Sequence, residues 1–140
     1  MSECLTFEYQ VPGDDFTRAG EASSSVKNKL KMMGVDSGAI RRAAIAMYEG
    51  EINMVIHAGG GAIKVMVTDD NIRIILADTG PGIPDVEKAM QLGYSTAPEE
   101  VRSLGFGAGM GLPNMKKYSD NMQIDTEVGV GTTVTMDIHL

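Results

Sequence analysis

Cysteine, tryptophan and basic residues are scarce in this sequence. The one cysteine, Cys4, excludes an intramolecular disulfide framework and a cysteine-rich metal site. The 12 lysines and arginines against 19 aspartates and glutamates leave a formal net charge of −7, which argues against sequence-independent binding to nucleic acid or to an anionic membrane. No apolar run approaches the ~20 residues of a membrane-spanning helix, and the amino terminus lacks the basic and apolar regions of a signal peptide. We therefore expect a cytoplasmic protein that contacts neither membrane nor nucleic acid directly.

The composition is that of a folded globular domain. Apolar residues make up 43% and charged residues 22% of the 140 positions, close to the averages of soluble proteins, so we do not expect disorder. No internal repeat, low-complexity tract or linker divides the chain. We expect one domain over residues 1–140.

Hydrophobic periodicity predicts five strands and several helices. Apolar and polar residues alternate at 5–11 and at 132–140, which is the period of half-buried strands. Further strands are expected at 62–68, 72–78 and 122–128, and an Asp-Asp-Asn turn joins the first two of these. Helices are expected from Asp14 or Asp15 to about Met33, over 38–58, over 84–92, and from the glycine-rich stretch 105–111 to about Tyr118.

This order of elements predicts an α+β two-layer sandwich. Most of the strands are joined by short turns, so the sheet is largely antiparallel, and the helices can cover one of its faces. The opposite face carries Lys64, Gln123, Asp125 and Glu127 and is expected to be partly wet.

The second long helix carries a carboxylate on an apolar stripe. At about 100° per residue, Ile45, Glu49 and Ile52 project within one arc, with Asn53 beside it. This stripe is the one best suited to face the sheet, where burying a charge is costly unless the charge is used. Alternatively the helix is rotated and Glu49 is solvated, in which case Glu51 has the same surface role.

An aspartate and two glycines follow the strand expected at 72–78. The sequence Asp78-Thr79-Gly80-Pro81-Gly82 places a carboxylate at the end of an apolar strand, beside glycines that permit close backbone approach. Such a carboxylate can accept a hydrogen bond from an amino group, for example that of adenine. The alternative is an ordinary Asx turn leading into the next helix.

A run of alternating glycines precedes the last helix. Residues 105–111 contain four glycines and expose successive backbone N–H donors at a helix N-terminus, a favourable place for phosphate. The run lacks the preceding strand of the dinucleotide-binding fingerprint, and the sequence contains no G-x-x-x-x-G-K-[ST] loop.

Taken in order, these motifs resemble the ATP-binding domain shared by DNA gyrase, the heat-shock chaperone ATPase, histidine kinases and mismatch-repair proteins. The matching positions are Glu49-x-x-x-Asn53, Asp78-x-Gly80-x-Gly82, Gly107-x-Gly109-x-Gly111 and Gly131-Thr132. Within that superfamily the chain is most similar to the small bacterial anti-sigma factors and stressosome switch kinases, which phosphorylate serine or threonine on partner proteins. The resemblance implies a Bergerat-type fold with a mixed, largely antiparallel sheet.

The resemblance also implies roles for individual residues in binding ATP and Mg²⁺. Glu49 would be the general base and Asn53 the Mg²⁺ ligand, and Asp78 would bind the adenine amino group. Gly80 and Gly82 would belong to the same adenine motif, with Gly82 letting the base lie close to the backbone. The phosphates would be wrapped by Gly107, Gly109, Met110 and Gly111. Thr132 lies in phase with Val134, so its hydroxyl is expected to point toward the helices and to support the adenine site.

Two features separate the chain from a complete histidine kinase. About 35 residues precede the ATP-binding helix, and neither His57 nor His139 lies on a dimerisation helix, so histidine autophosphorylation is not expected. For His57 we expect a structural role near the helix end. A lid is expected at 93–104, and its part 97–104 resembles the lid of anti-sigma kinases. Arg102 in this segment either reaches the γ-phosphate or is solvated.

The leading hypothesis is a serine/threonine kinase that acts on an anti-sigma-factor antagonist or a similar small regulatory protein. The resemblance also allows a sigma factor as a second partner and a homodimer as the assembly. Two alternatives stay open, an ATP-sensing adaptor that sequesters a partner without phosphorylating it and a stand-alone ATPase module.

Overall fold

Five strands form one sheet in the order β1-β2-β3-β5-β4, and all four pairings are antiparallel. The strands are β1 (Leu5–Pro12), β2 (Gly60–Val67), β3 (Asn71–Ala77), β4 (Asn121–Glu127) and β5 (Gly131–His139). The computed structural model describes residues 4–13, 20–57, 59–83, 86, 90 and 111–140. The predicted α+β fold with a largely antiparallel sheet of five strands is confirmed, and each predicted strand lies within two residues of its observed bounds.

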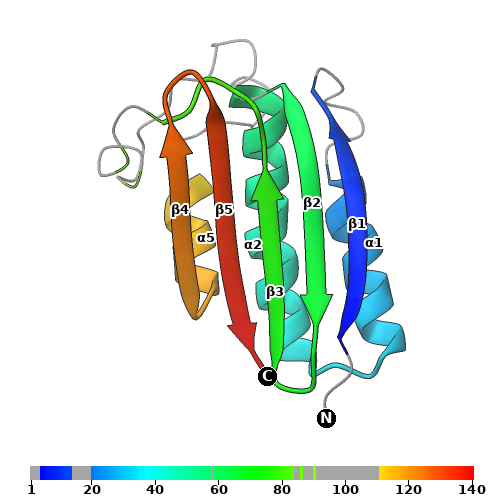
Figure 1. Cartoon of the computed structure of the whole chain (residues 1–140). Coiled ribbons are helices and arrows are strands. Elements are labelled where there is room, and N and C mark those ends of the chain that lie inside the picture. Colours follow the sequence, from blue (N-terminus) through cyan, green and yellow to red (C-terminus); the bar gives the residue numbers. More distant parts are fainter. Residues whose placement is uncertain (1–3, 14–19, 58, 84–85, 87–89, 91–110) are drawn as a thin grey trace.

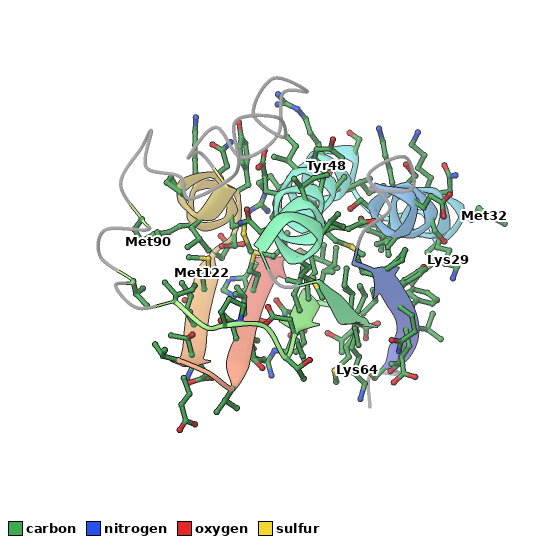
Figure 2. All side chains as sticks on the ribbon, turned by 90° about the horizontal axis from the view of Figure 1, so that it is seen from above. Lys29, Met32, Tyr48, Lys64, Met90 and Met122 are labelled. Carbon is green, nitrogen blue, oxygen red and sulfur yellow. The ribbon has the colours of Figure 1, made fainter. Side chains whose placement is uncertain are left out.

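In the described part of the chain, three helices cover one face of the sheet: α1 (Glu21–Met32), α2 (Ser37–His57) and α5 (Gly111–Tyr118). Helix α2 crosses the middle of the sheet and packs between α1 on one flank and α5 on the other (Figure 1). The opposite face of the sheet has no helix on it in the described part of the chain, and Lys64 points away from the helices there (Figure 2). None of the described helices is long and apolar enough to cross a membrane.

The core lies between the sheet and the inward side of α2. That side carries the buried residues Ile40, Ala43, Met47 and Met54, which recur at three-, four- and seven-residue spacing and pack over the buried side chains of β2, β3 and β5. Glu49 follows Met47 by two residues, or about 200° around the helix, and is only half-buried. The expectation that the stripe through Glu49 faces the sheet is therefore wrong. Helix α2 is apolar on most of its circumference, so periodicity alone does not select the buried side.

Helix α1 begins at Glu21 and not at Asp14 or Asp15 as expected. Its N-cap is Gly20, with φ of 97°, so the helix does not continue back through this residue, and residues 14–19 lie outside the described part of the chain. Of the helix expected at 84–92 only Val86 and Met90 are described, and the Met90 N–H donates to the Val86 carbonyl at 3.0 Å. The expected lid at 93–104, with Arg102, lies outside the described residues.

Candidate functional site

Four elements bring those predicted site residues that the structure describes to one end of the molecule. The end of β3, the start of β5, the second half of α2 and the N-terminus of α5 all lie at the end opposite the marked chain termini (Figure 1). Asp78 follows β3, Thr132 opens β5, and Glu49 and Asn53 lie on α2. Residues far apart in the sequence therefore share one region, where a bound molecule can touch several of them.

The Asp78 carboxylate uses one of its oxygens to hold the turn after β3. Its Oδ1 accepts hydrogen bonds from the N–H groups of Gly80, at 2.9 Å, and Thr132, at 3.1 Å. The Asp78 N–H in turn donates to the Thr132 carbonyl at 2.9 Å. Its Oδ2 has no hydrogen-bond donor among the described residues. The carboxylate therefore forms the Asx turn and still has one acceptor oxygen for a ligand amino group.

Two threonine hydroxyls connect this turn to the β4–β5 hairpin. Thr132 is 8% exposed and shares the helix-facing side of β5 with Val134, as expected from its phase. Its hydroxyl hydrogen-bonds at 2.9 Å to that of Thr126, the residue opposite it in the hairpin, and Thr126 also accepts the Ile83 N–H at 2.9 Å. Thr126 was not predicted as a site residue, although the Thr126–Thr132 pair follows from the hairpin register once that register is known.

Gly82 and Gly131 allow the backbone of the turn after β3 to touch that of the β4–β5 hairpin. Gly82 has φ of +80°, and a Cβ there would lie 2.6 Å from the Glu127 carbonyl oxygen. Gly131 has φ of +150°, and a Cβ there would run into the Asp78 carbonyl oxygen. Both positions favour glycine for conformational and steric reasons. These contacts show a structural requirement for Gly82 that is separate from its expected place beside adenine.

Glu49 and Asn53 on α2 face the first turn of α5. The Asn114 side-chain amide donates to Glu49 Oε1 at 3.5 Å, and the Asn53 amide donates to the sulfur of Met115 at 3.9 Å. Partial burial raises the pKa of the Glu49 carboxyl above its ordinary value of 4.5, while the hydrogen bond from Asn114 lowers it. A carboxyl with a raised pKa, beside a helix N-terminus, is suited to accept a proton.

The donor set around Asn53 fits Mg²⁺ held largely by phosphate and water. Because Nδ2 of Asn53 is directed to Met115, its Oδ1 is left as an oxygen ligand with no donor among the described residues. The described part of the chain contains no cluster of three or more His, Cys, Asp or Glu residues that would enclose a metal ion. Mg²⁺ is commonly bound through one or two protein oxygens together with substrate phosphates, so the residues present fit this ion.

Helix α5 presents its N-terminus to the same region. Gly111 is its first residue, and Asn114 and Met115, which contact Glu49 and Asn53, lie three and four residues further on. The free N–H groups of a helix's first turn attract anions. The prediction that the glycine-rich stretch 105–111 binds phosphate depends on such a helix N-terminus. Gly107, Gly109 and Met110 lie outside the described residues, as does the side chain of His57.

Glu51 is a buried anchor for α1 and not the surface residue that we considered. Its side chain is 2% exposed. Its two oxygens accept hydrogen bonds from the N–H groups of Gly20, Ala22 and Ser23 and from the Ser23 hydroxyl, at 2.7–3.3 Å. The N-cap residue of α1 is a glycine with no side chain to cap the helix, so a carboxylate from α2 does so. The position was missed because the contact joins residues 31 apart in the sequence.

Comparison with known proteins shows where this architecture recurs. Residues 38–140 match the family described as histidine kinase-, DNA gyrase B- and HSP90-like ATPase. The chain is 34% identical over 142 residues to the anti-sigma F factor of Geobacillus kaustophilus, covering 97% of this chain and 90% of that protein. It is 32% identical over 124 residues to the serine/threonine-protein kinase RsbT of Bacillus subtilis, covering 86% and 85%.

A solved structure of low sequence identity supports the fold assignment and carries no argument about function. A crystal structure of the RsbU and RsbW domains of Rv1364c from Mycobacterium tuberculosis superposes with a TM-score of 0.64 at 16% identity. The match covers 96% of this chain and 32% of that one.

Proposed function

Because this chain belongs to the family of histidine kinase-, DNA gyrase B- and HSP90-like ATPases, we propose that it is an ATP-dependent serine/threonine kinase acting on a small regulatory protein of the anti-sigma-factor antagonist type. The observation that carries the proposal is the half-buried Glu49, which lies at the N-terminus of α5 and whose pKa is raised by burial. A sigma factor would be a second partner, and the assembly would be a homodimer.

Phosphoryl transfer depends mainly on positioning and on neutralising charge, and the site residues divide these tasks. Asp78 Oδ2 would bind the adenine amino group, while Gly80 and Thr132 hold the carboxylate in place through Oδ1. Asn53 Oδ1 would bind Mg²⁺, which when present offsets the charge of the phosphates. The N–H groups that open α5, continuing from Gly107, Gly109 and Met110 to Gly111, would donate to the phosphate oxygens.

Glu49 would act on the hydroxyl that receives the phosphoryl group. Asn114 donates to Oε1, so Oε2 is the oxygen left to take the proton of a serine or threonine hydroxyl. The hydroxyl oxygen forms a bond to the γ-phosphorus, the bond from that phosphorus to the β–γ bridging oxygen breaks, and ADP leaves. Asn114 would keep the carboxylate oriented toward the acceptor.

Transfer of label from γ-³²P-ATP to purified antagonist-like acceptor proteins tests this proposal. We expect Glu49→Gln to lower the transfer rate by about 10²–10⁴-fold while ATP affinity is kept, because base assistance is lost and the binding groups remain. Glu8→Gln, on the exposed part of β1, is the matched control and should not change the rate.

The other outcomes separate the alternatives. A wild-type protein that binds ATP tightly and labels no acceptor would be an adaptor, and phosphate release without an acceptor would indicate an ATPase module. If Glu49→Gln transfers phosphate at the wild-type rate, Glu49 is not the base. Glu51 cannot replace it, because its two oxygens are occupied by α1.

A further inference from the structure

A groove runs between α1 and α2 on the side of the helix layer turned away from the sheet. Its volume is about 680 Å³, and its walls include Gly20 and Lys27 of α1 and Ala44, Tyr48 and Glu49 of α2. Glu49 belongs both to this groove and to the contact with α5. The groove is therefore continuous with the place where an acceptor hydroxyl would meet its base.

The floor of the groove is apolar although it faces outward. Tyr48 is 39% exposed and lies on the outer side of the helix layer (Figure 2). Ala44 and Ile45 extend the same strip along α2. The Tyr48 ring packs beside Gly20, where a Cβ would lie 3.0 Å from Cε1. A partly exposed aromatic ring next to small and aliphatic side chains is typical of a surface that binds a peptide.

The two ends of the groove carry opposite charges. Tyr48 packs against Gly20, so its neighbour Glu49 lies at the end of the groove where α1 begins, as does Glu21. Lys27 lies about two helical turns further along α1, and it forms no ion pair with any residue that the structure describes. A ligand that lies along the groove would thus meet a carboxylate at one end and an ammonium group at the other. This complements a segment with a neutral hydroxyl at the first end and an acidic side chain at the second.

The length of the groove sets the spacing of those two groups. Lys27 lies seven positions after Gly20, the residue that Tyr48 contacts at the Glu49 end, which at 1.5 Å per helical residue is about 10 Å. An extended chain advances about 3.3–3.6 Å per residue, so about three residues cover this span.

We propose that the groove binds an extended segment of the acceptor protein, with its serine or threonine at Glu49 and an aspartate or glutamate about three residues away at Lys27. The proposal rests on the kinase function above and adds the chemistry that selects the substrate.

Fluorescein-labelled heptapeptides provide the test. Each contains one serine, with glutamate three residues before or after it, and a matched set carries lysine in place of glutamate. Anisotropy with a non-hydrolysable ATP analogue measures binding, and γ-³²P-ATP measures transfer. The proteins are the wild type, Lys27→Glu and the control Lys31→Glu, which alters the same helix beyond the groove lining.

Of the two peptides with glutamate before or after the serine, we expect the one whose glutamate reaches residue 27 to bind Lys27→Glu about three- to tenfold more weakly than the wild type at low salt. The difference should be smaller at high salt. The lysine peptide should bind Lys27→Glu better than it binds the wild type, and Lys31→Glu should behave as the wild type. If the wild type binds none of the peptides, or if Lys27→Glu leaves their affinities unchanged, the proposal is wrong.

Two further results are distinguishable. Binding that depends on Lys27 without any phosphoryl transfer supports the groove as the peptide site and contradicts the kinase function. Transfer that does not depend on Lys27 supports the kinase function and contradicts the groove as the peptide site. Dimerisation that Lys27→Glu abolishes would show that a second copy of the chain occupies the groove and would overturn the proposal.

Discussion

Removing the Glu51 carboxylate should destabilise the protein strongly. The side chain is 2% exposed and accepts hydrogen bonds from the N–H groups of Gly20, Ala22 and Ser23 and from the Ser23 hydroxyl. Glu51→Ala leaves these donors at the N-terminus of α1 without a partner. A hydrogen bond to a charged group contributes about 1.5–3 kcal/mol, but bonds that share one carboxylate are not additive. We therefore expect a loss of about 3–5 kcal/mol in the free energy of unfolding, the scale for breaking a buried charge network.

Urea unfolding followed by far-ultraviolet circular dichroism measures this loss, since the sequence has no tryptophan to serve as a fluorescence probe. Glu51→Gln keeps one acceptor oxygen, places an amide group against the remaining donors, and should lose about 1–3 kcal/mol. The Glu51→Gln variant tests the anchoring role even if the alanine variant does not fold. Glu8→Ala, at an exposed pair with Lys64 at 3.9 Å, is the control and should lose less than about 0.5 kcal/mol. A Glu51→Ala protein within about 0.5 kcal/mol of the wild type would refute the anchoring role.

Two further predictions concern the site. Because burial raises the pKa of Glu49, its carboxyl stays protonated to a higher pH than an ordinary glutamate, and the transfer rate at saturating ATP should fall as the pH drops through this raised pKa. If the rate falls with a midpoint at or below pH 4.5, the fall does not arise from a Glu49 carboxyl whose pKa is raised by burial. Gly131→Ala should combine backbone strain with a clash against Asp78, adding about 1–3 kcal/mol of overpacking to the strain. Gly129→Ala, at φ of +82° with open space around it, should show only the strain of about 1–2 kcal/mol; equal melting temperatures for the two variants would contradict the contact.

Local patterns were sufficient to predict the five strands, although not their order in the sheet. Alternation along β5 and the turn between β2 and β3 determine which residues pair and which face inward, so the burial of Thr132 with Val134 followed from phase. The order of motifs also placed Glu49, Asn53 and Asp78 near one another. Their proximity depends on the crossing of elements, which the resemblance to the family supplied.

Contacts between distant elements could not be predicted. The rotation of α2 depends on how α1 and α5 pack on its flanks, and several of its sides are apolar enough to face the sheet. The start of α1 at Glu21 depends on Glu51, a residue on another helix. In the same way, Thr126 acquires its role only when the β4–β5 hairpin meets the turn after β3.

Calorimetric titration of Asp78→Asn with ATP and Mg²⁺ tests the central claim most directly. The variant keeps Oδ1 for the N–H groups of Gly80 and Thr132, so the turn is preserved, but it places an amide donor where Oδ2 would accept the adenine amino group. We predict that the wild type binds ATP and that the variant loses about 1–3 kcal/mol of binding free energy, or about five- to 150-fold in affinity. Asp125→Asn, on an exposed position of β4, should bind as the wild type does. Wild-type affinity in Asp78→Asn would contradict the assignment of this site to ATP.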